Sequence, residues 1–237
     1  MSAVAELIKL PGVWRGGELE HATRPSIPTG HALLDAELPG GGWPTGTLAE
    51  VLHEGVGIGE VSFLCRAIAQ ACGEARMAAW INPPHLPYAP ALAQSGLPLD
   101  RCLVVRPVSR EDALWAAEQA LKSGACGAVL MWIEATQTGR AGEYAWMRRL
   151  QMAAEAGRVM AVVFRPTSVE RQSTPAHLRI VLAREDGALR ARIPKRRGPP
   201  LARSIEIRAG YSCAPSRIEP AAHPVRVAAR KLHLVSR

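Results

Sequence analysis

The chain has 237 residues, a net charge of +8 and 48% hydrophobic residues, but only 5% aromatic ones. This length suits one α/β domain with extensions or two small domains, and the apolar content is enough for a buried core. No apolar run reaches the roughly 18 residues that a membrane-spanning helix requires, so we expect no membrane segment.

A lead-in rich in glycine and proline occupies residues 11–47, and regular structure is expected from Thr47 onward. Short apolar runs there alternate with segments that have one apolar helical face and end at a glycine. The sequence SRED at residues 109–112 has the pattern of a capping box at the start of one such helix. Strands are predicted at residues 47–52, 77–81, 103–105, 128–133 and 159–164, and helices at residues 61–72, 88–95, 109–123 and 142–156.

Three further segments, residues 177–183, 189–193 and 204–207, alternate between polar and apolar side chains without helices between them. They predict antiparallel strands that complete the sheet. Alternating β and α units followed by such strands are typical of an α/β fold, with a three-layer core and a central mixed, mostly parallel β-sheet. We expect an N-terminal extension at residues 1–24, the core at residues 25–208 and a basic C-terminal tail at residues 209–237.

The positive charge is concentrated toward the C-terminus. Residues 190–237 contain twelve Lys or Arg and two Glu, which gives +10, whereas residues 1–189 have a net charge of −2. Such a segment attracts nucleic acid or an acidic protein surface, although a charged tail can also serve solubility alone. Residues 225–234 have the pattern of a short basic helix that forms on a partner, with Arg226, Arg230 and Lys231 as candidate contacts.

The cysteines and the N-terminus indicate a protein of the cytoplasm. The five cysteines form neither a C-x-x-C pair nor an even framework, so we expect reduced and mostly buried thiols. Residues 1–10 contain Glu6 and Lys9 and lack the architecture of a signal peptide. The seven histidines show no spacing that suits a metal, and we expect neither a metal nor a cofactor. The cysteines are Cys65, Cys72, Cys102, Cys126 and Cys213.

A glycine-rich turn at residues 54–61 (EGVGIGEV) lies between the first predicted strand and helix, where a phosphate-binding loop would lie. A working loop reads G-x-x-x-x-G-K-[ST], in which the lysine contacts phosphates and the hydroxyl residue holds Mg²⁺. Its four fixed positions hold Glu54, Gly59, Glu60 and Val61, so only the second glycine remains. A carboxylate at the lysine position would face the triphosphate and repel it. An ordinary strand–turn–helix connection is the alternative interpretation.

Other residues that could belong to a functional site are interpreted as ordinary surface or packing residues. Glu134 follows a buried strand, where catalytic carboxylates of doubly wound sheets lie, but a surface-loop position is the preferred interpretation. His85 is interpreted as a packing or surface residue. We expect no catalytic residue in this chain. Four tryptophans are expected in the core: Trp80, Trp115, Trp132 and Trp146.

An ordered series of motifs resembles the RecA recombinase core over residues 25–207. The segments IPTGHALLD (residues 27–35) and GGGWPTG (residues 40–46) are similar to the string that precedes the first strand and phosphate loop of that family. The likeness continues at residues 80–85, 123–125, 147–150 and 189–201. The KRRGPP string at residues 195–200 and the degenerate loop make the chain similar to the ImuA family, which comprises RecA/SulA-like accessory proteins of translesion DNA synthesis.

The departures from the RecA pattern imply that hydrolysis is lost. The family's catalytic glutamate falls on Pro84, its metal-holding aspartate on Trp132 and its γ-phosphate-sensing glutamine on Pro166. With the altered loop, four requirements of phosphoryl transfer are missing: charge neutralisation, metal placement, water activation and sensing. The two DNA-binding loops of the family are also shortened, between Trp132 and Met147 and between Pro166 and His177.

The resemblance also implies partners. Lys195 and Arg197, which flank Arg196, match the paired lysines that RecA subunits extend across the filament interface onto a neighbour's ATP. These cations alternatively belong to the generic basic tail. The implied partners are a RecA filament, an ImuB-like Y-family polymerase homologue and an error-prone replicative-type polymerase subunit, with DNA bound through the tail in a nucleoid-associated location.

Two other functions stay open at this point. One is a SulA-type cell-division inhibitor that binds the tubulin-like division protein, since that family shares the same degenerate core. The other is an ATP-dependent RecA-like DNA-repair ATPase, which would need a cation from elsewhere, such as Arg66. An adjacent polymerase gene would favour the translesion function over both.

Overall fold

The computed structural model describes residues 25–134, 140–198, 201 and 203–207. Its centre is an eight-stranded sheet. In chain order the strands are β3 (Thr47–His53), β4 (Met77–Ile81), β5 (Cys102–Val105), β6 (Cys126–Trp132), β7 (Met160–Pro166), β8 (Leu178–Glu185), β9 (Ala188–Lys195) and β10 (Ile205–Ile207). Their spatial order is β10-β9-β8-β3-β7-β6-β4-β5.

The sheet is mixed and mostly parallel, as the sequence predicts. Strands β8, β3, β7, β6, β4 and β5 run parallel to one another, and β9 and β10 add antiparallel pairs at the β8 edge. One expectation was wrong, because β8 pairs in parallel with β3 and only its other edge pairs antiparallel with β9. The crossover from β7 to β8 contains only the short helix η2 (Thr167–Val169), so it lacks the long helix that usually marks a parallel connection.

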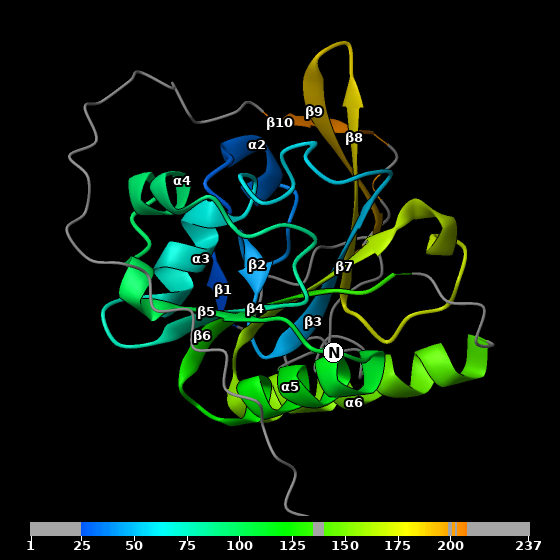
Figure 1. The fold of residues 1–237 in the computed structure, drawn as a ribbon. Coiled ribbons are helices and arrows are strands. Elements are labelled where there is room, and N and C mark those ends of the chain that lie inside the picture. Colours follow the sequence, from blue (N-terminus) through cyan, green and yellow to red (C-terminus); the bar gives the residue numbers. More distant parts are fainter. Residues whose placement is uncertain (1–24, 135–139, 199–200, 202, 208–237) are drawn as a thin grey trace, which may run out of the picture.

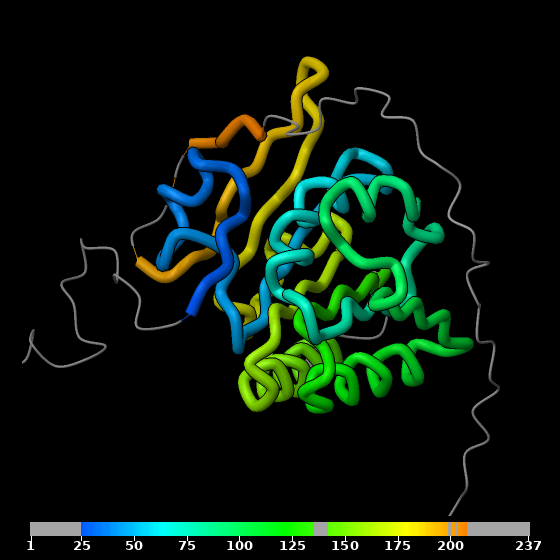
Figure 2. Tube along the Cα trace, turned by 90° about the vertical axis from the view of Figure 1, so that its left-hand side faces the viewer, coloured from blue at the N-terminus to red at the C-terminus, as the bar shows by residue number. Residues whose placement is uncertain are grey.

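Helices cover both faces of the sheet, which gives the three layers of an α/β fold (Figure 1). The helices α3 (Cys65–Cys72) and α4 (Ala89–Gln94) lie on one face, and α5 (Arg110–Lys122) and α6 (Arg140–Gly157) lie on the other, as the rotated view also shows (Figure 2). We call the first the α3 face and the second the α6 face. No helix in the described ranges is both long and apolar enough to cross a membrane.

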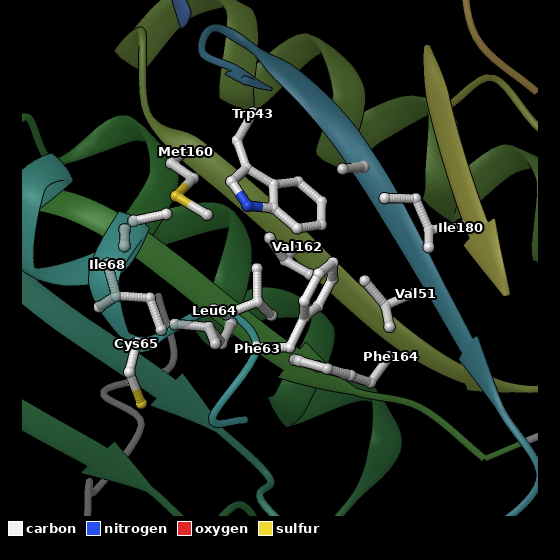
Figure 3. Packing of buried hydrophobic residues seen from close by; sticks show 14 of the residues in the cluster. Trp43, Val51, Phe63, Leu64, Cys65, Ile68, Met160, Val162, Phe164 and Ile180 are labelled. Atoms are coloured by element: carbon white, nitrogen blue, oxygen red, sulfur yellow. The ribbon is translucent and has the colours of Figure 1, made fainter. Parts of the chain in front are cut away.

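Alternate strand residues build the core on the α3 face. Figure 3 shows Phe63, Leu64 and Ile68 packed against Met160 and Val162 of β7. The helix can approach the sheet closely because β6 carries a glycine beneath it. A Cβ atom on Gly127 would lie 2.2 Å from the carbonyl oxygen of Ala71 in α3.

The boundaries of α5 follow the predicted cap, because the Ser109 Oγ accepts a hydrogen bond from the Asp112 amide at 3.0 Å. The start of α3 differs from the prediction, since regular helix begins at Cys65 and not at Val61. The residues between form turns, in which the Phe63 amide donates to the Gly59 carbonyl. No side chain caps the first turn of α3, so the glycine loop continues into turns before the helix is established.

The lead-in is more structured than the sequence suggests. It contains the short antiparallel pair β1 (Ser26–Ile27) and β2 (Trp43–Pro44) and the one-turn helix α2 (Ala32–Asp35). Trp43 is fully buried and packs edge to face with Phe63, which fixes this segment over the α3 face. The predicted N-terminal extension, the C-terminal tail and the proposed helix at residues 225–234 lie outside the described residues.

Candidate functional site

The glycine loop at residues 54–61 follows β3 at the carboxyl end of the parallel strands. Ligands of open α/β sheets bind at this edge, so the loop is the first candidate site. Gly57 and Gly59 have positive φ angles of 83° and 105°, a conformation that side chains other than glycine rarely adopt.

The Glu60 side chain binds the backbone of its own loop. Its side chain is buried, at 4% exposure. Its Oε1 accepts a hydrogen bond from the Gly57 amide at 3.2 Å, and its Oε2 accepts one from the Gly59 amide at 3.1 Å. The carboxylate thus binds amides of its own loop, and its repulsion of a triphosphate stays a prediction. The chain itself thus supplies the anion that the amides of this glycine loop bind.

The other loop residues contribute less. Glu54 is exposed, and Val61 is half-buried against the core of the α3 face. The β8–β9 hairpin holds the loop from outside, because the Arg184 Nη2 donates to the Ile58 carbonyl at 3.2 Å. The loop is thus fastened both by its own glutamate and by a strand from the far half of the chain.

Aromatic rings of β4, β6 and β7 stack on one another in the core of the α3 face. Trp132 stacks on Phe164 with ring centroids 4.4 Å apart and on Trp80 at 6.0 Å. Trp132 occupies the position at which the resemblance places a metal-holding aspartate, and it is 7% exposed. The stack offers no oxygen ligand for a cation. Within the described residues no group of three or more His, Cys, Asp or Glu side chains could hold a metal.

The tryptophan predictions are confirmed except for Trp115. Trp80, Trp132 and Trp146 are buried, whereas Trp115 is 52% exposed. The reason is helical geometry, because α5 buries one face and presents Trp115 on the opposite side. The buried residues of α5 are Ala113, Ala117 and Leu121.

The three cations at the end of β9 make different contacts. The Arg196 side chain is buried and lies 3.1 Å from Glu37 Oε2, so it fastens β9 to the segment after α2. The Lys195 Nζ donates to the Thr174 carbonyl at 2.7 Å, and burial lowers the pKa of this lysine. Arg197 is half-buried nearby. Three further candidates, Arg226, Arg230 and Lys231, lie outside the described residues.

The remaining candidate residues lie where their interpretation as surface or packing residues places them. Glu134 is exposed just beyond β6, and His85 is exposed after β4. Cys65, Cys72 and Cys126 are buried and form no disulfide within the described part of the chain, and Cys102 is half-buried. Burial raises the pKa values of Cys72 and Cys102 to about 11, so these thiols are poor nucleophiles. Cys213 lies outside the described residues.

Sequence reasoning missed a buried ionic cluster on the α6 face. Glu50 of β3 is fully buried and lies directly opposite Arg179 of β8. Its two oxygens accept from Arg165 Nη1 at 3.0 Å and from Arg179 Nε at 2.7 Å. Arg165 Nη2 also donates to Glu143 Oε2 at 2.7 Å, which joins the strands to α6. The available signal was a charged residue inside each apolar strand, at Glu50, Arg165 and Arg179.

Comparisons with known proteins match a part of this core. Residues 47–161, just under half of the chain, match the family model described as cell division inhibitor SulA. The chain is 32% identical over 112 residues to a cell division inhibitor SulA of Photorhabdus laumondii, which covers 47% of this chain and 60% of that protein. It is 27% identical over 151 residues to the SulA of Pectobacterium atrosepticum, covering 63% of this chain and 77% of that protein.

The chain is also similar to RecA. It is 33% identical over 113 residues to protein RecA of Cutibacterium acnes, which covers 48% of this chain and 32% of that RecA. The chain thus spans about a third of this RecA and 60% of the first SulA. Similarity to both families supports the RecA-like and SulA-like parts of the resemblance.

Proposed function

We propose that this chain is a non-catalytic, RecA-like protein-binding module of the DNA-damage (SOS) response. The carrying observation is the buried Glu60 carboxylate on the Gly57 and Gly59 amides. A nucleotide phosphate would have to displace this carboxylate from the same donors, and it would gain no lysine in return. The aromatic stack of Trp132 on Phe164 supports the same proposal, since it provides no ligand for Mg²⁺.

Nucleotide binding by the purified chain tests this proposal. We expect no heat of binding in titration calorimetry with ATP and Mg²⁺, and no hydrolysis in the presence of single-stranded DNA. A Glu60→Gln variant shows whether the Glu60 carboxylate masks a phosphate site, because it removes the negative charge while keeping the size of the side chain. Micromolar ATP binding by the wild type, or hydrolysis that depends on Glu134, would show that the chain is an ATPase.

The first proposed context is translesion DNA synthesis. The resemblance to the ImuA family and the similarity to RecA support an adaptor that meets a RecA filament, an ImuB-like polymerase homologue and an error-prone polymerase subunit. In this proposal the chain docks on a filament as a subunit without ATP. Lys195 and Arg197 then reach the ATP of the last true RecA subunit, where cation–phosphate contacts are strong. Lys195 has to leave the Thr174 carbonyl to do so.

The second proposed context is inhibition of cell division, and the SulA family match over residues 47–161 favours it. In that case the partner is the tubulin-like division protein. One experiment separates the two contexts: the purified chain is added to ATP-bound RecA filaments and, separately, to the polymerising division protein. Binding to filaments that is lost in a Lys195→Ala, Arg197→Ala double variant supports the adaptor. Arrest of the division polymer without filament binding supports the inhibitor.

A further inference from the structure

A polar cavity of about 280 Å³ opens on the α6 face, on the opposite side of the sheet from the Glu60 carboxylate. Its wall combines Glu143 at the start of α6, Arg165 at the end of β7 and residues 171–173 of the crossover to β8. It therefore lies where two elements meet at the carboxyl edge of the sheet, a place where α/β proteins bind ligands.

The cationic side chains around this cavity outnumber the carboxylates. Glu143 is approached by Arg165 at 2.7 Å and by Arg110 at 3.8 Å, and Glu50 is shared between Arg165 and Arg179. The buried charges of this cluster balance, since the guanidinium groups of Arg165 and Arg179 face two carboxylates. The excess positive charge comes from Arg110, which is partly exposed, and from the exposed Arg171 on the cavity wall.

One hydrogen-bond donor of the Arg165 guanidinium is unused among the described residues. The Arg165 Nε is buried and has no acceptor among the described residues, although its two Nη atoms are engaged. Gln172 and Ser173 add neutral polar groups to the same wall, and the Gln172 Oε1 lies 3.5 Å from Arg165 Nη2. A guanidinium N–H donor backed by amide and hydroxyl groups is suited to an oxyanion.

We propose that this cavity binds a small dianionic molecule through its phosphate or carboxylate oxygens, with Arg171 and Arg165 as the binding cations. The volume admits one such group together with a few further atoms. The site is independent of the proposed function, because it uses none of the residues of the glycine loop. Its occupant would join α6 to the β7–β8 crossover.

Titration of the purified chain with inorganic phosphate and with succinate, at constant ionic strength, tests the site. We expect saturable binding of at least one anion, seen by calorimetry and as a raised melting temperature, and the stronger anion identifies the oxyanion type. Arg171→Ala should weaken that binding by about tenfold or more, since it removes a charge-assisted contact. Because Arg171 is exposed, the variant should fold normally.

Arg148→Ala is the matched control, since Arg148 is an exposed arginine of α6 that is not part of the cavity wall. Its affinity for the anion should equal that of the wild type. The proposal fails if neither anion binds saturably, or if both variants weaken binding equally. It also fails if a single-stranded oligonucleotide displaces the anion with the same dependence on Arg171, because the site would then belong to nucleic acid.

Discussion

Two glutamates of one short loop have opposite roles. Glu60 is buried and accepts two backbone hydrogen bonds, whereas Glu54 is exposed six residues earlier. The sequence identified both as departures from a phosphate-binding loop, but it could not give the direction of either side chain. That direction depends on which loop amides lack acceptors, and only the folded backbone determines it.

Replacing Glu60 should destabilise the protein. Glu60→Gln keeps one acceptor oxygen but removes the charge, and we expect the free energy of unfolding to fall by about 1–3 kcal/mol. Urea denaturation measures this change. Glu54→Gln is the matched control and should change the free energy by less than about 0.5 kcal/mol. Equal losses in the two variants would mean that the Glu60 hydrogen bonds contribute little.

At the scale of elements, local patterns were predicted and long-range pairings were not. Ser109 caps α5 through a residue three positions away, so the cap was visible in the sequence. The parallel pairing of β8 with β3 was hidden, because no helix lies in the crossover between β7 and β8. The ionic cluster was hidden for a related reason, since Glu50 and Arg179 are 129 residues apart in the chain.

The ionic cluster should be the most sensitive point of the sheet. Glu50→Ala leaves Arg165 and Arg179 buried without their shared carboxylate, and we expect a loss of about 3–5 kcal/mol in unfolding free energy. Glu185→Ala is the control, because Glu185 pairs with Arg190 at the exposed end of the β8–β9 hairpin. That substitution should cost less than about 1 kcal/mol. If the two costs are similar in urea denaturation, the buried cluster is not a stabilising link.

At the scale of the whole molecule, carboxylates hold segments that are distant in the sequence. Hydrogen bonds from arginine or lysine lower the pKa values of three of them below the ordinary 4.5. Glu37 is bound first by Arg203 and then by Arg196, which ties the lead-in to the β9–β10 edge. The other two are Glu118, which links α5 to α6, and Glu170, which pairs with Arg192.

Stability should therefore fall with acid in two steps. The unfolded chain takes up protons on these carboxylates before the folded protein does, so their contribution is present above about pH 5 and is lost below it. Burial also lowers the pKa of His31 below 6.5, so protonation of the unfolded chain begins an earlier decline below about pH 7. Urea midpoints at several pH values check this. His31→Gln should remove the earlier step alone, and a flat profile would contradict both.

DNA binding by the whole chain should depend on the basic tail. Residues 190–237 carry a charge of +10, and phosphate contacts by such a segment release counterions. Deleting residues 209–237 should remove a large share of the binding to single-stranded DNA, and wild-type affinity should drop steeply between about 50 and 200 mM salt. Fluorescence anisotropy measures both effects. Undiminished binding by the truncated chain would place the contact on the core.

The aromatic stack at the carboxyl edge of the sheet has an optical consequence. Trp80 and Trp132 lie 6.0 Å apart with their rings inclined by 14°, a fixed and chiral arrangement. The electronic transitions of two indoles held in this way couple, and they give the folded protein a circular dichroism signal that separated tryptophans do not have. Circular dichroism can therefore report whether the carboxyl edge of the sheet is folded, without an added label. In RecA-like folds this edge binds nucleotides.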